Sequence, residues 1–332
     1  GIIKGNTAEY GGGVAGGFIE ITSGEILQNK AEKYGGGLYI RDSIKMTGGK
    51  ISENTASVDG GGVYNEGTFE VKDAATVIDN GVNKDNNVRM KDSNHPIIVS
   101  GKCIGKIRVR PPEVNQVAVK AIPEYTISQT DATCFEADGE NTYLELIDNA
   151  LVYREIILVN GGTSGDLQSA VNKICDYGII WVSGTIEMSG EVSVDNKSVE
   201  IIGKDNAKLI RAPGSTSSIL SFHHNSNSII ENLIIDGNKD NVTESTNSPI
   251  YIDDGAKLTM RSGTIQNSNT KNDGGGIYIY CGTFEMLDGT ISKNTASRDG
   301  GGIYNYKGIL TISDGTITEN TASSDGGGIY NN

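Results

Sequence analysis

Three consecutive glycines followed by an aliphatic residue recur six times in this chain of 332 residues. Within each of two groups, the runs follow one another at intervals of 24–26 residues. They begin at Gly11, Gly35, Gly60, Gly274, Gly300 and Gly326. A fixed period of this length marks a solenoid, in which each repeat packs on its neighbours. The period therefore constrains the fold more than any other feature of the sequence.

Apolar residues recur in register through these repeats. Two columns lie two positions apart with a polar residue between them, which is the alternation of a half-buried strand. The first column holds Ile19, Ile44, Phe69, Leu258, Phe284 and Leu310, and the second holds Ile21, Met46, Val71, Met260, Met286 and Ile312. Two further columns hold Ile26, Ile51, Val77, Ile265, Ile291 and Ile317, and Val14, Leu38, Val63, Ile277, Ile303 and Ile329.

Three short strands separated by glycine-containing turns fill each period and leave no room for a helix. Each repeat is therefore predicted to form one coil of a parallel β-helix, with like residues stacked from coil to coil. In this register the polar residues Glu20, Lys45 and Glu70 share one outward column. We expect Lys45 to lie between the two carboxylates.

Glycine and asparagine recur at the predicted corners of the coils. Glycine adopts positive φ without a Cβ clash and also lets successive turns approach closely. The pattern Ile-x-x-Asn places Asn29, Asn54, Asn294 and Asn320 in one register, and Asn80 follows Val77 in the same way. We expect these asparagines to form a hydrogen-bonded ladder that satisfies buried turn groups. Ser268 interrupts it.

These repeats resemble the coils of the right-handed β-helix of the pectin-lyase-like superfamily. Within it they are most similar to the Gly-Gly-Gly-Ile-Tyr-Asn and Thr-Ile-x-x-Asn-Thr-Ala repeats of large bacterial surface proteins. They also resemble the Gly-Gly-Ala-Ile and Phe-x-x-Asn repeats of chlamydial polymorphic outer-membrane proteins. The resemblance is specific over about residues 1–80 and 250–332. It implies an elongated, adhesin-like or wall-associated protein at the bacterial cell surface and leaves the ligand open.

The period fails after Asn83, which divides the chain. Residues 1–80 are predicted to be the C-terminal part of a first β-helix, and residues 81–158 to form irregular terminal coils with a small β cap and hairpin. Apolar residues at helical spacing predict a short capping helix near 165–176, at the start of a second β-helix over 159–332. The fold is thus predicted to be all-β, with two solenoids in series. One continuous β-helix with an insertion is the alternative.

Composition excludes several classes of function. The net charge of −14 and a pI near 4.7 provide no electrostatic footprint for nucleic acid or an anionic membrane. No run of 18 apolar residues is present, so membrane insertion of this segment is not expected. The four cysteines lack metal-ligand spacing, and buried free thiols are favoured over a pair between Cys103 and Cys134.

The sequence offers one candidate catalytic group. Polysaccharide lyases and hydrolases on this fold need clustered carboxylates, a base and in many cases Ca²⁺. The candidates are His223, His224, Asp236 and Asp253. Asp236 also fits a strand that ends in an Asp-Gly turn, and the group lacks the spacing of a lyase motif. A protein without enzymatic activity is therefore favoured, and no cofactor other than Ca²⁺ is considered.

Two further columns are candidate binding features. Asp273, Asp299 and Asp325 precede the glycine runs, where stacked carboxylates indicate either turn caps or a Ca²⁺ column, with turn caps favoured. Tyr278, Tyr304 and Tyr330 are expected to face outward. A ladder of rings stabilises a sheet and also provides a platform for sugar rings, of which the structural role is favoured.

The favoured function is an extracellular structural or adhesive β-solenoid, part of a large bacterial surface protein or filament. A polysaccharide-active enzyme and a carbohydrate-binding module are the alternatives, and a glycan or host-surface ligand is the expected partner. Neither end of the sequence shows a capping helix. We therefore expect the chain to be a window in a longer array or to associate end to end.

Overall fold

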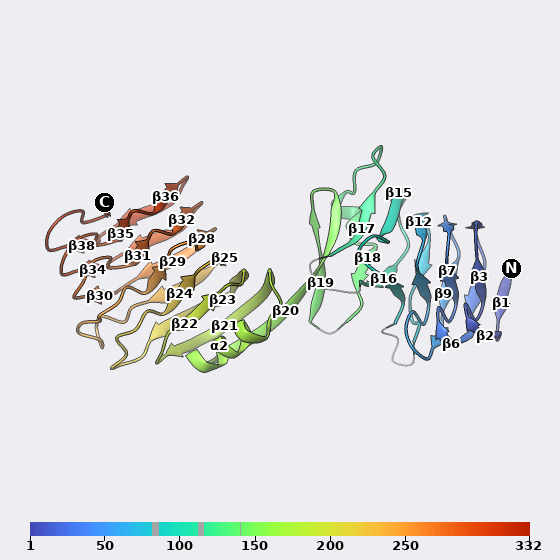
Figure 1. Ribbon diagram of the computed structural model, residues 1–332, viewed down its shortest axis with the longest axis horizontal. Helices are drawn as coiled ribbons and strands as arrows, with labels where there is room; N and C mark the ends of the chain where they lie inside the picture. The colour runs from blue at the N-terminus through green and yellow to red at the C-terminus, as the bar shows by residue number, and fades with distance from the viewer. Residues whose placement is uncertain (82–85, 112–115, 140) are drawn as a thin grey trace. The chain divides into compact units, whose positions relative to one another are not determined.

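The computed structural model describes residues 1–81, 86–111, 116–139 and 141–332. The chain forms a parallel β-solenoid, so the predicted all-β class is confirmed. It divides into two compact units, residues 1–155 and 156–332 (Figure 1). Each unit has its own hydrophobic core. No helix in the described ranges is long and apolar enough to cross a membrane.

Four strands form each regular coil of the first unit. The chain enters through β1 (Ile2–Lys4) and β2 (Thr7–Tyr10). One complete coil is β3 (Val14–Gly16), β4 (Ile19–Ile21), β5 (Glu25–Leu27) and β6 (Lys30–Tyr34), and the next is β7 (Leu38–Ile40), β8 (Ser43–Met46), β9 (Lys50–Ser52) and β10 (Thr55–Ala56). The sequence predicted three strands per coil. The fourth, after the asparagine, was missed because a strand as short as β10 shows no alternation.

Parallel coils continue beyond the last glycine run of the first unit. The third coil holds β11 (Val63–Asn65), β12 (Thr68–Asp73) and β13 (Thr76–Val77), followed by β14 (Val88–Met90), β15 (Ile97–Cys103) and β16 (Ile107–Arg110). β14 and β15 pair in parallel with β11 and β12, and β16 pairs with β13. Beyond them come β17 (Val117–Ala121), α1 (Gln129–Ala132) and β18 (Phe135–Ala137). The predicted hairpin is confirmed as antiparallel β19 (Thr142–Ile147) and β20 (Ala150–Thr163).

A helix and two long strands open the second unit. α2 (Ser164–Lys173) agrees with the helix predicted near 165–176, and it buries Leu167 and Val171 in the core. The main chain N–H of Thr163 donates to the Asp166 carboxylate at 2.8 Å and so caps the helix. The strands that follow are β21 (Gly178–Met188), β22 (Val192–Asp195), β23 (Val199–Arg211), β24 (Leu220–His223), β25 (Asn227–Glu231) and β26 (Leu233–Asp236).

The remaining coils of the second unit are regular. They comprise β27 (Ile250–Ile252), β28 (Lys257–Met260), β29 (Gly263–Gln266) and β30 (Asn269–Thr270); β31 (Ile277–Tyr280), β32 (Thr283–Met286), β33 (Thr290–Ser292) and β34 (Thr295–Ala296); and β35 (Ile303–Tyr306), β36 (Ile309–Ile312), β37 (Thr316–Thr318), β38 (Thr321–Ala322) and β39 (Ile329–Asn331). One stack of strands, β22-β24-β27-β31-β35-β39, carries the candidate site described below.

The apolar columns form the cores, as their alternation predicted. Ile44 pairs with Phe69, and Leu258 pairs with Phe284, in register across successive coils. All four side chains are fully buried. The polar residues between them face outward, where the Lys45 ammonium lies 2.9 Å from the Glu70 carboxylate and Glu20 occupies the same column one coil earlier.

The glycine runs allow neighbouring coils to approach closely. Gly35 has φ of +69°, a left-handed conformation that disfavours any side chain with a Cβ. A Cβ on Gly36 would clash with the carbonyl oxygens of Thr55 and Gly61 in the next coil. The first glycine is thus required by conformation and the second by space.

The predicted asparagine ladder is present in both units. In the first unit each side-chain amide donates to the carboxamide oxygen of the next coil, from Asn29 to Asn54 at 3.0 Å and from Asn54 to Asn80 at 2.9 Å. The ladder then continues through Asn87 to the buried Asp138 carboxylate, which receives the Asn87 side-chain amide at 3.0 Å. In the second unit Asn294 donates to Asn320 at 3.1 Å, and the backbone N–H of Ser268 donates to Asn294.

The inward column predicts the effect of a charge in the core. Replacing Phe284 by Asp places a carboxylate without a partner among apolar side chains. We expect a loss greater than the roughly 3–5 kcal/mol that a Phe-to-Ala truncation costs, measured by urea unfolding of the second unit. Leu287→Asp is the matched control, because Leu287 is 38% exposed on an adjacent turn. Equal stability of the two variants would show that Phe284 does not face the core.

The close approach at the glycine run predicts a second destabilising change. Gly36→Ala forces the adjacent coils apart and should lower the free energy of unfolding of the first unit by about 1–3 kcal/mol. Gly101→Ala serves as the control, since its new methyl group meets only the Lys72 side chain at 3.6 Å and beyond. Thermal unfolding of both variants measures the difference. A Gly36 variant as stable as the wild type would contradict the steric role.

Candidate functional site

The outer surface of the stack β24-β27-β31-β35-β39 carries two columns of aromatic rings. Ile250, Ile277 and Ile303 alternate with these rings and are buried in the core. The first outward column passes from Ser221 to four tyrosines in register, and a second column begins two residues further along two of the strands. We call these rings the tyrosine face: Tyr251, Tyr278, Tyr280, Tyr304, Tyr306 and Tyr330.

Successive rings of the tyrosine face stack on one another. Ring centroids are 5.9 Å apart between Tyr251 and Tyr278, 5.0 Å between Tyr278 and Tyr304, and 5.3 Å between Tyr304 and Tyr330. In the second column Tyr280 and Tyr306 are 5.5 Å apart. Burial, followed by the neighbouring Tyr304, raises the pKa of the Tyr278 hydroxyl above its ordinary value. The hydroxyl therefore remains an uncharged hydrogen-bonding group at neutral pH.

Exposure varies along the tyrosine face. Tyr304, between two other rings, is 8% exposed, whereas Tyr280 is 42% exposed. The three tyrosines singled out in the sequence thus form a continuous ladder, joined by Tyr251, Tyr280 and Tyr306, which the glycine pattern did not reveal. Tyr251 follows Ile250 without a glycine run before it. Only the Ile-Tyr pair that it shares with the later coils could have identified Tyr251 from the sequence.

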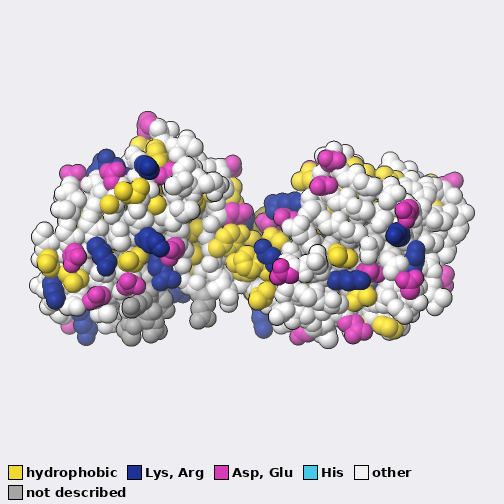
Figure 2. All heavy atoms as spheres, turned by 180° about the vertical axis from the view of Figure 1, so that it is seen from behind, with side chains coloured by type: hydrophobic (Ala, Val, Ile, Leu, Met, Phe, Trp, Pro, Cys, Tyr) yellow, Lys and Arg dark blue, Asp and Glu magenta, His cyan; other side chains and the backbone are white. Residues whose placement is uncertain are grey.

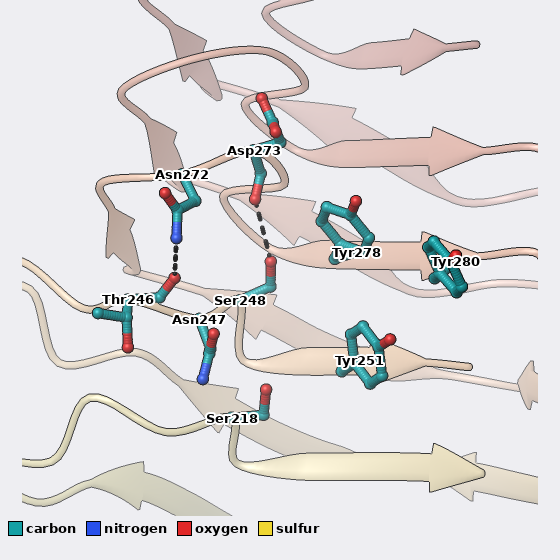
Figure 3. A pocket seen from close by; sticks show the side chains of 9 residues that line it. All are labelled: Ser218, Thr246, Asn247, Ser248, Tyr251, Asn272, Asp273, Tyr278 and Tyr280. Carbon is teal, nitrogen blue, oxygen red and sulfur yellow. Dashed lines mark hydrogen bonds between the residues drawn. The ribbon is translucent and has the colours of Figure 1, made fainter.

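A small pocket lies where the tyrosine face meets the turns that precede its strands (Figure 3). Its volume is about 210 Å³. It is lined by Ser218, Thr246, Asn247, Ser248, Tyr251, Asn272, Asp273, Tyr278 and Tyr280. Figure 3 shows the rings of Tyr251 and Tyr278 on neighbouring strands, with the polar side chains gathered at the strand starts. The pocket therefore combines aromatic surface with hydrogen-bonding groups.

A buried arginine holds the turn that borders this pocket. Arg211, at the end of β23, is fully buried, and its Nη2 donates to the carbonyl oxygens of Ser217 at 3.1 Å and Asn247 at 3.0 Å. Its Nη1 lies 3.5 Å from the Ser268 hydroxyl, and its Nε has no hydrogen-bond partner among the residues that the structure describes. Burial lowers the pKa of Arg211 to about 10. The sequence analysis did not identify this residue, which ends an ordinary strand pattern.

The two candidate histidines, His223 and His224, each contact an aspartate of a different coil. His223 Nδ1 lies 3.0 Å from Asp253 Oδ2, and the His223 ring lies 5.8 Å from that of Tyr251. His224 Nδ1 lies 2.5 Å from Asp195 Oδ1. Burial tends to raise the pKa of Asp253, but hydrogen bonds with His223 and other donors outweigh it and lower the pKa. This pair adjoins the first ring of the tyrosine face.

Asp236 lies in a different strand stack from the histidines. It ends β26, which pairs with β23 and β29, whereas His223 belongs to β24. The Asp236 carboxylate is buried and receives the Lys208 ammonium at 2.7 Å and the side-chain amides of Gln266 and Asn267, each at 3.1 Å. The structure therefore brings His223 together with Asp253 but not with Asp236. A carboxylate with these donors fixes local structure and is a poor proton acceptor.

The stacked aspartates accept backbone hydrogen bonds. Asp273 Oδ1 accepts the Asp299 N–H at 3.1 Å, and Asp299 Oδ1 accepts the Asp325 N–H at 2.9 Å. The Arg298 guanidinium lies 3.4 Å from Asp273 Oδ2. In the described part of the chain, no group of three or more His, Cys, Asp or Glu side chains is arranged to hold a metal ion. The contacts of the column are those of a turn.

The first unit has its own tyrosine cluster. Tyr39 and Tyr64 stack at 5.8 Å, and Tyr34 lies 4.5 Å from Tyr64. The Tyr39 hydroxyl donates to Glu66 at 2.6 Å. Burial and then this hydrogen bond raise the pKa of Tyr39 to about 12. Tyr39 is 6% exposed, so this cluster offers little ring surface to a ligand.

The cysteines are free thiols. Cys103 and Cys134 are buried, and Cys175 and Cys281 are half-buried. Burial and then the contact with Cys134 raise the pKa of Cys103 to about 12, so its reactive thiolate form is suppressed at neutral pH. Figure 2 shows acidic and basic side chains interspersed over the face that it draws. The surface there carries charges of both signs.

The donors around Asp236 predict a dependence of stability on pH. Hydrogen bonds from Lys208, Gln266 and others overcome burial and lower the pKa of Asp236 below its ordinary value of 3.8. The unfolded chain then binds the proton more tightly, so this stabilisation is present above about pH 4 and is lost as pH falls through the lowered pKa. We expect Asp236→Asn to lose about 1–3 kcal/mol at pH 7, a difference that shrinks toward pH 3.

Thermal melts between pH 7 and pH 3 measure this difference. Asp240→Asn is the control, because Asp240 is exposed and lies two residues after the buried Asn238. A constant difference between wild type and Asp236→Asn across this range would contradict the assigned role of the carboxylate.

Comparison with protein families identifies one repeat. Residues 288–306 and 314–332 match the Chlamydia polymorphic membrane protein repeat. Each matched stretch begins at an Asp-Gly turn and includes the ladder asparagine, the glycine run and a tyrosine of the tyrosine face. The comparisons with curated proteins and with solved structures give no match. The last two coils are thus similar to the repeats of chlamydial polymorphic membrane proteins.

Proposed function

We propose that this chain is a non-enzymatic structural or adhesive β-solenoid of the bacterial cell surface. The match of two coils to the Chlamydia polymorphic membrane protein repeat supports a surface location. The parallel coils support a scaffold role, because repetition produces an extended surface on which residues of neighbouring coils act together. The proposed partner is a glycan or another host-surface molecule.

The proposal rests on one observation: the candidate catalytic carboxylate of Asp236 is engaged in contacts that hold the local structure. Asp236 is enclosed by Lys208, Gln266 and Asn267 and lies in another strand stack from His223. Glycosidases and lyases require acid and base groups that converge on one substrate bond. The outward surface instead presents stacked tyrosines, which favour binding over cleavage.

One observation favours the enzymatic alternative. His223 lies 3.0 Å from Asp253, its other ring nitrogen is 3.9 Å from Glu191, and the group borders the tyrosine face. A histidine between two carboxylates is a combination used for proton transfer. A polysaccharide lyase or hydrolase centred on His223 and Asp253 is therefore the second candidate.

We expect no cleavage of pectin, alginate or glycosaminoglycans by the purified chain, with or without Ca²⁺. Release of unsaturated or reducing ends measures lyase and hydrolase activity. In parallel, antibodies against the folded chain should label intact cells that express the protein. Turnover that disappears in His223→Ala or Asp253→Ala would replace the scaffold proposal by the enzyme. Labelling only after the cells are permeabilised would contradict a surface location.

A further inference from the structure

We propose that the pocket at Tyr251 and Tyr278 is a binding site for a neutral pyranose, the sugar unit of an uncharged oligosaccharide. This inference deepens the proposed adhesive function, on which it rests, by naming the chemical class of the ligand. Further sugar units would follow the more exposed second column of rings, from Tyr280 toward Tyr306.

The aromatic wall matches one side of a pyranose ring. A tyrosine ring has a negative face, and the axial C–H groups of a pyranose form an apolar, weakly positive surface that packs on it. Tyr251 and Tyr278 present two such rings on neighbouring strands, seen nearly face-on in Figure 3. Tyr280 lines the same pocket and is 42% exposed. No described part of the chain covers this ring surface, so binding of a sugar would remove it from water.

Polar groups border the wall, where sugar hydroxyls would project. The exposed side-chain amide of Asn247 makes no hydrogen bond within the described residues, so both its donor and its acceptor are available. Asn272 donates through Nδ2 to the Thr246 carbonyl at 2.8 Å, which leaves its carboxamide oxygen free to accept. The Asp273 carboxylate oxygens each have lone pairs beyond their contacts with Asp299 and Arg298.

Arg211 provides an independent sign of a built site. Its guanidinium is fully buried, and within the described residues its hydrogen bonds go to the carbonyls of Ser217 and Asn247 and to the Ser268 hydroxyl, with no carboxylate. Burying a charge without a counter-ion is unfavourable for folding. Arg211 instead holds in place the turn that presents Ser218 and Asn247 to the pocket. Such preorganisation lowers the entropy lost on binding.

The charges around the pocket disfavour an acidic sugar relative to a neutral one. Asp273 lines it, Asp253 adjoins Tyr251 through a contact of 3.3 Å with the phenol oxygen, and the chain carries a net charge of −14. A uronate or sulfated sugar would be repelled, whereas the hydroxyls of a neutral sugar donate to these carboxylates. The pocket volume of about 210 Å³ suits one small ring. The rings of the next coils provide contacts for a longer chain.

The test measures binding by isothermal titration calorimetry with the whole 332-residue chain. The probes are linear hexasaccharides of glucose, mannose, galactose and N-acetylglucosamine, with the hexamer of galacturonic acid as the acidic probe. We expect at least one neutral hexasaccharide to bind and the acidic hexamer to bind at least about tenfold more weakly. The trisaccharide of the bound sugar should bind more weakly than its hexasaccharide, because it reaches fewer rings.

Four variants locate the site. Tyr278→Ala should weaken binding about tenfold, whereas Tyr278→Phe, which keeps the ring, should stay close to the wild type. Asn247→Ala removes an exposed amide that has no hydrogen-bond partner in the described part of the chain, so it should weaken binding without changing the melting temperature. Tyr177→Ala is the control, because Tyr177 is 48% exposed outside the tyrosine face.

Several results would overturn the proposal. These are the absence of binding by every neutral probe, tighter binding of the galacturonate hexamer, or unchanged affinity in both Tyr278→Ala and Asn247→Ala. If Tyr278→Ala unfolds, the Asn247 variant decides alone. None of these results affects the cell-labelling or cleavage assays, so a failure of the sugar site is distinguishable from a failure of the surface role.

Discussion

Parallel hydrogen bonding between coils is the constraint on which the rest of this structure depends. It places each residue beside its counterpart one repeat away, so residues of the same or similar type are neighbours along every column. A residue type is tolerated only if it can contact its own copy. Phe284 satisfies this condition by packing on Leu258 and Leu310 in the core, and Asn54 does so by donating to Asn80 and receiving from Asn29.

The same constraint explains why charged columns are modified from coil to coil. Identical carboxylates would repel one another at this spacing. On one face the chain places Lys45 between Glu20 and Glu70. At the turns, where Asp299 and Asp325 are stacked, the backbone N–H of the next aspartate supplies the compensating donor instead. Tyrosine needs no such device, because its ring is neutral and stacks, and a continuous aromatic surface results.

Most of the fold could be predicted from the sequence because the same pattern of apolar residues, glycine and asparagine recurs in each repeat. The apolar columns and the asparagine ladder lie where the period places them. The coils of β14–β16 were not predicted as regular, because their loops differ in length and remove the period while the pairing with β11–β13 persists. The ladder likewise passes to Asn87 and Asp138, whose positions in the sequence bear no fixed interval to Asn80.

The candidate site was less predictable, because it depends on contacts between coils that the period does not describe. His223 and Asp236 are close in the sequence, yet the chain leaves the stack of His223 after β24 and continues in another stack with β25 and β26. Arg211 bonds to Asn247, 36 residues further along the chain and beyond β24, β25 and β26, and no repeated motif indicates this contact.

The position of the pocket follows from a local failure of the repeat. At the coil that begins with β27, Ser248 and Pro249 stand where later coils have glycine. The Ser248 hydroxyl donates to the carbonyl oxygens of Asp273 and Gly274, and so replaces part of the backbone pairing that the glycine runs make elsewhere. The backbone of the preceding turn then follows a different course, and hydrogen bonds from the buried Arg211 hold it in place. A perfect repeat would continue the tyrosine ladder as a surface without a recess, so the pocket lies where the repetition is broken.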